Sequence, residues 1–232
     1  MTLHPRRDPR RGSRAAVSRV GLLGGTFDPI HHGHVAAARA AQQAVALDSV
    51  RFLPSARPPH RADSPRASEY HRLEMIRLAL ADAAAGGDAE WEVSDLELRR
   101  DGPSYTYDTF SALHAEGLTP LQIFFIIGAD AFAEIASWHR YPAVLEAAHF
   151  AVVTRPGISL DSLRRRLPAL ADRMIAPSAV TDSSHPRVVL IESSTPSVSS
   201  TDIRARASRG EPLNGLVSPS VAAYIEQHSL YR

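Results

Sequence analysis

Short apolar runs alternate along the chain with segments whose apolar positions recur at helical spacing. The run "LQIFFIIG" at 121–128 is the strongest candidate for a central strand, because it is rich in β-branched and aromatic residues. Further strands are predicted at 19–24, 50–54 and 187–192, and a strand followed by a turn at 149–157. The partly alternating stretch 91–100 predicts one or two more.

Helical patterns follow most of these runs. The predicted helices occupy 33–47, 69–83, 106–116, 159–170, 201–209 and 218–228. The third has Ser, Thr and Asp near its start and Gly117 at its stop. Two stretches are predicted as loops: 55–67, rich in Pro, Arg and Ser, and the irregular 171–186.

This order of elements defines a fold class. Strands that alternate with helices through short connections predict a parallel sheet covered on both faces. Right-handed crossovers then give a doubly wound, Rossmann-like α/β fold with a C-terminal helical segment. Ligands of such folds bind beyond the carboxyl ends of the strands, where the strand order switches. The glycines after the first strand and the "GAD" after "FFII" are expected at that edge.

Composition narrows the class of protein. A chain of 232 residues with 44% hydrophobic content suits one large domain with a sizeable core. No apolar run approaches the roughly 20 residues that span a bilayer, so no membrane association is expected. The absence of cysteine excludes disulfides, thiolate metal sites and thiol nucleophiles, and suits the cytoplasm. All 26 basic residues are arginine, so a phosphate must be met by Arg, His, a metal or backbone dipoles.

Charge is divided unevenly along the chain. Residues 1–19 hold six arginines against Asp8, a net charge of +5, so the remainder carries −4 of the total of +1. Residues 1–18 lack apolar periodicity and are predicted to be a disordered, Arg-rich extension, with 19–232 forming a single domain. An organelle transit peptide is the alternative interpretation of this extension. A mildly acidic body argues against a nucleic-acid-binding fold.

The stretch "GGTFDPIHHGH" at 24–34 carries the first candidate chemistry. Gly24 and Gly25 allow positive φ and close approach of a ligand, and the following backbone N–H groups and helix dipole favour phosphate. His31 and His34, three positions apart, can both face that space and donate to phosphate oxygens. A plain turn with structural histidines, or a zinc site lacking its third ligand, are the alternatives. Neither Gly-x-Gly-x-x-Gly nor the Walker A pattern is present.

This stretch resembles the signature of the nucleotidylyltransferase superfamily. The (H/T)-x-G-H element falls on His31, Gly33 and His34, and His32 is its variable position. The longer form, with Thr26, Phe27, Asp28 and Pro29, is similar to the bacterial nicotinate-nucleotide adenylyltransferase family. The resemblance extends over nearly all of 19–232.

A second motif, "SVSSTDIRARASRG" at 197–210, resembles the same superfamily's I-S-S-T-x-I-R element. Its Ser and Thr residues are good N-caps for a helix that contains Ile203 and Arg204. Alone, the stretch reads as an ordinary capped helix. Together with the first motif it predicts a second anion site at Ser200, Thr201 and Arg204, so that two helix starts clamp one triphosphate.

The resemblance also implies roles for segments between the two motifs. "LPSARPPHR" at 53–61 is similar to a substrate loop of the family, although Arg61 stands where Lys is usual. "PSYTYDT" at 103–109 and "IIGADAFAEIASWHRY" at 126–141 match segments that approach the pyridine ring and the nucleotide hydroxyls. His139 stands where Tyr is common, and a backbone N–H there meets the carboxylate of nicotinate. The implied contacts with ATP include Gly128 and Asp130, and those with the second substrate are Pro59, His60, Arg61, Tyr105, Thr106, Trp138, His139 and Arg155.

The implied reaction joins ATP and nicotinate mononucleotide into nicotinate adenine dinucleotide and pyrophosphate, a step of NAD biosynthesis. His31, His34 and Arg204 are the implied catalytic residues, and Mg²⁺ is expected to arrive on ATP without a protein ligand of its own. Another adenylyltransferase, with nicotinamide mononucleotide or phosphopantetheine as acceptor, and a non-catalytic nucleotide-binding regulator are the alternatives. A homo-oligomer is left open.

Overall fold

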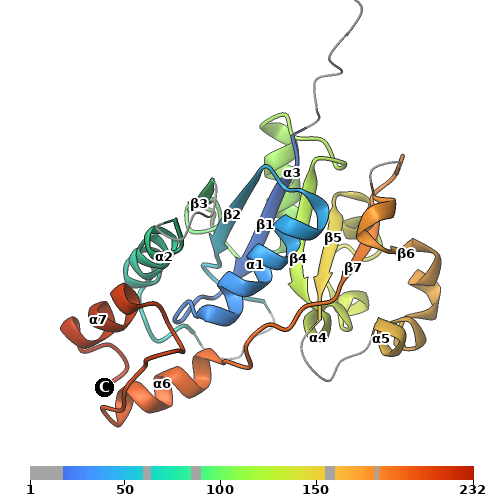
Figure 1. Ribbon diagram of the computed structural model, residues 1–232. Coiled ribbons are helices and arrows are strands. Elements are labelled where there is room, and N and C mark those ends of the chain that lie inside the picture. The colour runs from blue at the N-terminus through green and yellow to red at the C-terminus, as the bar shows by residue number, and fades with distance from the viewer. Residues whose placement is uncertain (1–17, 60–63, 85–89, 155–159, 181–182) are drawn as a thin grey trace, which may run out of the picture.

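A parallel β-sheet forms the centre of the molecule. The computed structural model describes residues 18–59, 64–84, 90–154, 160–180 and 183–232. Within these residues the sheet has seven strands, in the order β3-β2-β1-β4-β5-β7-β6, and all its pairings are parallel (Figure 1). The strands are β1 (Val20–Gly25), β2 (Ser49–Pro54), β3 (Trp91–Val93), β4 (Ile123–Gly128), β5 (His149–Val153), β6 (Met174–Ile175) and β7 (Val188–Ile191).

The strand order reverses between β1 and β4. From β1 the chain builds outward through β2 and β3, and then returns to place β4 on the other side of β1. Leu23 of β1 pairs with Ile126 of β4, and Gly24 pairs with Leu53 of β2. The carboxyl ends of these strands open a crevice at the switch point, which is where ligands bind in open parallel sheets.

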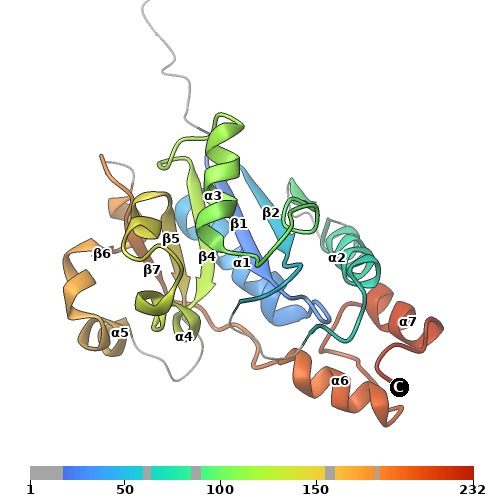
Figure 2. The ribbon, with the colours of Figure 1, turned by 180° about the vertical axis from the view of Figure 1, so that it is seen from behind.

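Helices cover both faces of the sheet, as the sequence predicts (Figures 1 and 2). The α-helices are α1 (His32–Val45), α2 (Glu69–Ala84), α3 (Thr106–Ala115), α4 (Ala129–Phe132), α5 (Leu160–Arg166), α6 (Ser200–Ser208) and α7 (Pro219–Gln227). The 3₁₀ helices are Ile135–Ser137, Ala143–Glu146, Pro168–Arg173 and Pro177–Ala179. Helices α1, α2, α6 and α7 contribute to the hydrophobic core on one face of the sheet. Helices α3, α4 and α5 contribute to the core on the opposite face.

The central strand β4 shows why the apolar run at 123–127 is continuous. Phe124 and Ile126 enter the core beneath α1, while Ile123, Phe125 and Ile127 enter the core beneath α3. Because consecutive side chains of a strand point to opposite faces, a strand buried on both faces needs an apolar residue at every position. The prediction of a central strand here is confirmed.

Two predicted elements differ from the structure. The strand predicted over 91–100 ends at Val93, and the chain then forms a helical turn in which Arg99 N–H donates to the Asp95 carbonyl at 3.0 Å. The segment 171–186, predicted as a loop, contains the strand β6 beside β7. With only two residues, β6 is too short to produce a periodic pattern.

The Arg-rich helix predicted over 159–170 is also shorter. Helix α5 ends at Arg166, because Leu167 precedes Pro168 and takes a non-helical backbone (φ −123°, ψ 61°). The chain continues as a 3₁₀ helix. Among the described helices, none combines the length and the apolar character needed to cross a membrane. The predicted extension at 1–18 lies outside the described residues, apart from residue 18.

Candidate active site

A cavity of about 350 Å³ opens at the carboxyl ends of β1 and β4, at the switch point of the sheet. Side chains and backbone from β1, α1, β4 and the start of α3 form its walls. Many of the residues that the sequence singles out line it. They are Gly24, Gly25, Thr26, Gly33, His34, Pro59, Tyr105, Thr106, Gly128, Trp138 and His139.

The loop after β1 differs from expectation in its backbone. Neither Gly24 nor Gly25 is in the left-handed region, and it is Phe27 that takes φ +48°. The two glycines matter because they lack a side chain: a Cβ on Gly25 would lie 3.1 Å from the Phe27 ring, and one on Gly24 would lie 3.3 Å from Phe125. The buried Phe27 ring thus folds back beneath the loop, which leaves the backbone open toward the cavity.

His31 and His34 form a stacked pair at the start of α1. Their ring centroids are 3.7 Å apart, and His31 N–H donates to His34 Nδ1 at 3.2 Å. Since Nδ1 accepts this bond, a neutral His34 carries its proton on Nε2. His34 lines the cavity, whereas His31 is buried behind it and is not part of the lining. The Phe27 and His34 rings also meet edge-on. This contact, the stacking on His31 and the hydrogen bond from the His31 N–H together fix the orientation of the His34 ring.

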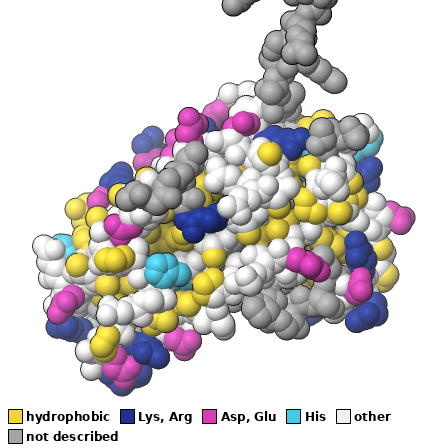
Figure 3. Space-filling view, in the orientation of Figure 1, with side chains coloured by type: hydrophobic (Ala, Val, Ile, Leu, Met, Phe, Trp, Pro, Cys, Tyr) yellow, Lys and Arg dark blue, Asp and Glu magenta, His cyan; other side chains and the backbone are white. Residues whose placement is uncertain are grey.

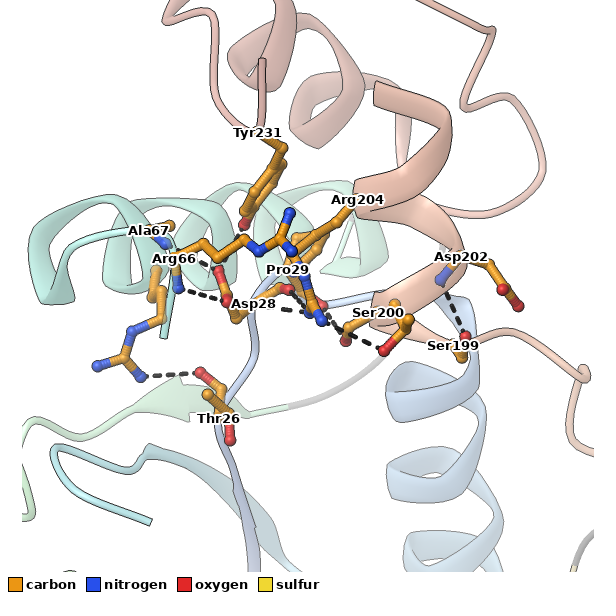
Figure 4. A network of polar contacts seen from close by, with 12 residues as sticks. Thr26, Asp28, Pro29, Arg66, Ala67, Ser199, Ser200, Asp202, Arg204 and Tyr231 are labelled. Carbon is orange, nitrogen blue, oxygen red and sulfur yellow. Dashed lines mark hydrogen bonds and ion pairs between the residues drawn. The ribbon is translucent and has the colours of Figure 1, made fainter. Parts of the chain in front are cut away.

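Helix α6 brings the second motif against the first (Figure 4). As predicted, Ser199 caps the helix, its Oγ accepting from Asp202 N–H at 3.1 Å. Ser200 Oγ donates to the Pro29 carbonyl at 3.0 Å, and Arg204 Nη1 donates to the Asp28 carbonyl at 2.8 Å. Two segments more than 165 residues apart therefore meet at the loop that precedes α1.

The α6 residues do not line the cavity itself. Ser200 and Arg204 contact the loop on its Asp28–Pro29 side, and Thr201 Oγ1 accepts a hydrogen bond from Arg204 Nη2. The chain just before α6 does reach the cavity, because Thr195 is part of its lining. Asp130 is exposed in the first turn of α4, directly after Gly128. His34 and the glycines line the cavity, as do Gly128 and Ala131, which precede and follow Asp130 in the sequence.

Aromatic side chains form the other end of the cavity. The rings of Tyr105 and His139 stack with centroids 4.1 Å apart, and Trp138 stands edge-on to Phe125 at 6.1 Å. Thr106 begins α3. The stacking on Tyr105 thus holds the His139 ring in place, and the sequence did not indicate this contact. His60, Arg61 and Arg155 lie outside the described residues.

Glu97 is a cavity residue that the sequence reading missed. It is 6% exposed, lines the cavity, and accepts a hydrogen bond from Thr109 Oγ1 at 2.7 Å. Burial raises the pKa of the Glu97 carboxyl, with the Thr109 hydroxyl and the Arg100 charge acting in the opposite direction. Glu97 lies in the stretch 91–100, which was predicted as one or two strands. Nothing in that stretch distinguishes Glu97 from an acidic residue that faces solvent.

Arg72 of α2 is a second missed residue. Its side chain is fully buried, and Nη1 donates to the carbonyls of Thr26 and Ser55, both at 2.8 Å. One guanidinium therefore joins the loops that follow β1 and β2. The available signal was its spacing from Met75 and Ile76, three and four positions on, which places Arg72 on the buried face of α2.

The described residues hold no group of three or more His, Asp or Glu side chains that could bind a metal ion. The donors around the cavity are imidazole, hydroxyl, guanidinium and backbone N–H groups. Such groups suit an anion carrying several phosphates, to which they present hydrogen-bond donors and positive charge.

A doubly wound parallel sheet with such a crevice at its switch point is the architecture of nucleotide-binding α/β proteins. The chain belongs to the cytidylyltransferase-like family, whose model matches residues 22–206. The resemblance identified from the two motifs is thereby confirmed.

Individual relatives are similar over almost the whole chain. A protein of Roseiflexus sp. (strain RS-1), named "Probable nicotinate-nucleotide adenylyltransferase", is 42% identical over 213 residues, which cover 92% of this chain and 98% of that protein. A protein of the same name from Pseudomonas entomophila is 42% identical over 223 residues, 95% and 98% of the two chains. A Plasmodium falciparum nicotinic acid mononucleotide adenylyltransferase, solved in complex with NaAD, has the same fold at 17% identity. Its TM-score is 0.69, over 92% of this chain and 97% of that one.

Proposed function

We propose that this protein transfers the adenylyl group of ATP to nicotinate mononucleotide. An oxygen of the mononucleotide phosphate attacks the α-phosphorus of ATP and forms a new P–O–P bond. The bond between the α-phosphorus and the β-phosphate oxygen breaks, and pyrophosphate leaves. The products are nicotinate adenine dinucleotide and pyrophosphate, a step of NAD biosynthesis. The attacking phosphate is already anionic at neutral pH, so the reaction needs no general base.

The observation that carries this proposal is the meeting of the two motifs at one loop. His34 lies in the cavity with its ring fixed on both sides, and Arg204 is tied to the same loop by the Asp28 carbonyl. In the proposed mechanism His34 donates to the oxygens around the reacting phosphorus, and His31 holds its ring. Ser200, Thr201 and Arg204 hold the β- and γ-phosphates. Catalysis then rests on positioning and on charge stabilisation.

The two ends of the cavity suit the two remaining parts of the substrates. Gly24, Gly25 and Gly128 carry no side chain, so the part of the cavity that they line has room for the nucleotide. Asp130, in the first turn of α4, then accepts hydrogen bonds from the nucleotide hydroxyls. The aromatic end at Trp138 offers a surface on which a pyridine ring can stack. There the backbone N–H groups near Thr106 and His139 are suited to the nicotinate carboxylate.

Mg²⁺ enters this mechanism as part of the MgATP substrate. Mg²⁺ commonly keeps several waters and is held chiefly by substrate phosphates, so the proposed mechanism assigns it no protein ligand. The ion neutralises charge on the triphosphate when it is bound. The chain contains no cysteine, as suits a reducing compartment, and we place the reaction in the cytoplasm.

The test is release of pyrophosphate from ATP, measured with the acid and the amide mononucleotide in parallel. Turnover with the acid that exceeds turnover with the amide supports the proposal. Turnover restricted to the amide or to phosphopantetheine would reassign the acceptor. ATP binding without pyrophosphate release from any acceptor would leave a nucleotide-binding regulator.

His34→Ala tests the mechanism within that assay. We expect kcat to fall by about 10²–10³, the loss typical of one donor to developing charge. The matched control is His32→Ala, which keeps the backbone N–H bond from His32 to the Leu216 carbonyl and should retain activity. A His34→Ala variant that folds and turns over at the wild-type rate would contradict the role given to His34.

A further inference from the structure

The Asp28 carboxylate is buried at the point where four segments of the chain meet (Figure 4). It is 3% exposed. Its Oδ2 accepts from Arg66 N–H at 2.8 Å, and its Oδ1 accepts from Ala67 N–H at 3.1 Å and from the Tyr231 hydroxyl at 2.9 Å. Tyr231 follows α7 in the sequence and lies 203 residues from Asp28. None of the roles proposed above uses this hydroxyl.

Arg204 of α6 lies beside the same carboxylate without engaging it closely. Its Nη1 donates to the Asp28 carbonyl at 2.8 Å but remains 3.9 Å from Oδ2. Nη2 donates to Thr201 Oγ1 at 3.2 Å, and the buried Nε has no hydrogen-bond partner among the described residues. A guanidinium ordinarily prefers two parallel bonds to a carboxylate. Three other donors already bond the carboxylate, two at Oδ1 and one at Oδ2.

We propose that Tyr231 positions Arg204 for the triphosphate. By filling Oδ1 of Asp28, the phenol keeps the guanidinium on the backbone carbonyl and leaves its remaining donors for phosphate oxygens. Without the hydroxyl, Oδ1 loses one of its two donors, and Arg204, whose Nη1 lies 3.9 Å from Oδ2, is a cation that can turn toward the carboxylate. The charge of Arg72 also acts on Asp28, but its Nη1 is held by the carbonyls of Thr26 and Ser55. This inference rests on the proposed function, in which Arg204 holds the β- and γ-phosphates.

The phenol is suited to this task because it remains a donor. Burial raises the pKa of Tyr231, and the neighbouring Asp28 charge and hydrogen bond raise it further. The hydroxyl therefore keeps its proton, and remains a donor to Asp28, at neutral pH. Its ring packs against the core shared by α1, α2 and α7, which holds the oxygen in place.

Tyr231→Phe removes only the hydroxyl and keeps that packing. Dissociation constants are measured by calorimetry for MgATP and for AMP, which lacks the β- and γ-phosphates. We expect the Kd for MgATP to rise about tenfold, the effect of one lost charge-assisted hydrogen bond, and the Kd for AMP to change less than twofold. The matched control is Tyr224→Phe, which removes a hydroxyl of α7 that is bonded to His71 Nδ1 at 2.9 Å instead of to Asp28. It should bind both nucleotides like the wild type.

A double-mutant cycle with Arg204→Gln identifies the route of the effect. If Tyr231 acts through Arg204, the phenylalanine substitution should not weaken MgATP binding further in the glutamine background. A Tyr231→Phe protein that binds MgATP as the wild type does, or that loses MgATP and AMP equally, would overturn the inference while the proposed function stands. Wild-type protein that fails to bind MgATP would overturn the proposed function, and this inference with it.

Discussion

His149 should make the folded protein sensitive to acid at the end of the sheet opposite the cavity. It begins β5, is 2% exposed, and stacks on the Phe124 ring with centroids 4.5 Å apart. Its Nδ1 accepts from Arg187 N–H at 3.0 Å. Burial lowers the pKa of His149 from 6.5 to about 4, and the charges of Arg19 and Arg187 act in the same direction.

The sign of the effect follows from these values. In the unfolded chain His149 takes up a proton near pH 6.5, whereas in the fold it resists protonation until about pH 4. Its contribution to stability is therefore complete above pH 6.5 and is lost as the pH falls toward 4. The difference between the two pKa values corresponds to ~3 kcal/mol of unfolding free energy.

His149→Asn isolates this contribution. The Asn Oδ1 takes the place of Nδ1 as acceptor for Arg187 N–H, and the side chain does not titrate. Denaturant unfolding is measured from pH 7.5 to 4 for both proteins. The variant starts less stable, since it leaves a cavity beside Phe124, and it should gain ~3 kcal/mol on the wild type across the range. Parallel curves would refute the reasoning, because every other titrating group cancels in the difference.

Two further predictions concern the cavity. Gly128→Ala should raise KM without lowering Tm, because the added Cβ meets no atom within 4 Å and occupies ligand space. Gly21→Ala should instead lower stability by about 1–3 kcal/mol and leave KM unchanged, because its Cβ would lie 2.7 Å from Leu47 Cδ1. Equal KM values for Gly128→Ala and Gly21→Ala would contradict this prediction. Glu97→Gln should gain in Tm relative to the wild type as pH rises above the ordinary glutamate range, since burial raises the pKa of Glu97 and penalises its charged form. A Tm difference independent of pH would exclude that penalty.

Local patterns in the sequence were sufficient for most of the elements and for the fold class. The run at 123–127 is apolar at every position because β4 is buried on both faces, and that requirement is visible without coordinates. The Ser199 cap of α6 was likewise readable, because a capping side chain bonds within three residues of itself. The glycines after the first strand and the "GAD" after "FFII" could be expected at one edge of the sheet because the carboxyl ends of parallel strands share that edge.

What the sequence left open depends on contacts between distant residues. Nothing near Glu97 marks it as buried, and the helical spacing of Arg72 indicates its buried face but not its partners. Their environments are built by Thr109, Thr26 and Ser55 from other elements. The left-handed backbone conformation occurs at Phe27 and not at the two glycines that precede it. The Phe27 ring lies against Gly25, a contact that the sequence does not reveal.

The pairing of Tyr231 with Asp28 spans 203 residues and exists only once α7 has packed on α2. Sequence alone therefore determined most of the strands and helices and the family to which the motifs belong. Tertiary structure decided which donor meets which acceptor, because burial and hydrogen bonding between remote segments are properties of the packed chain.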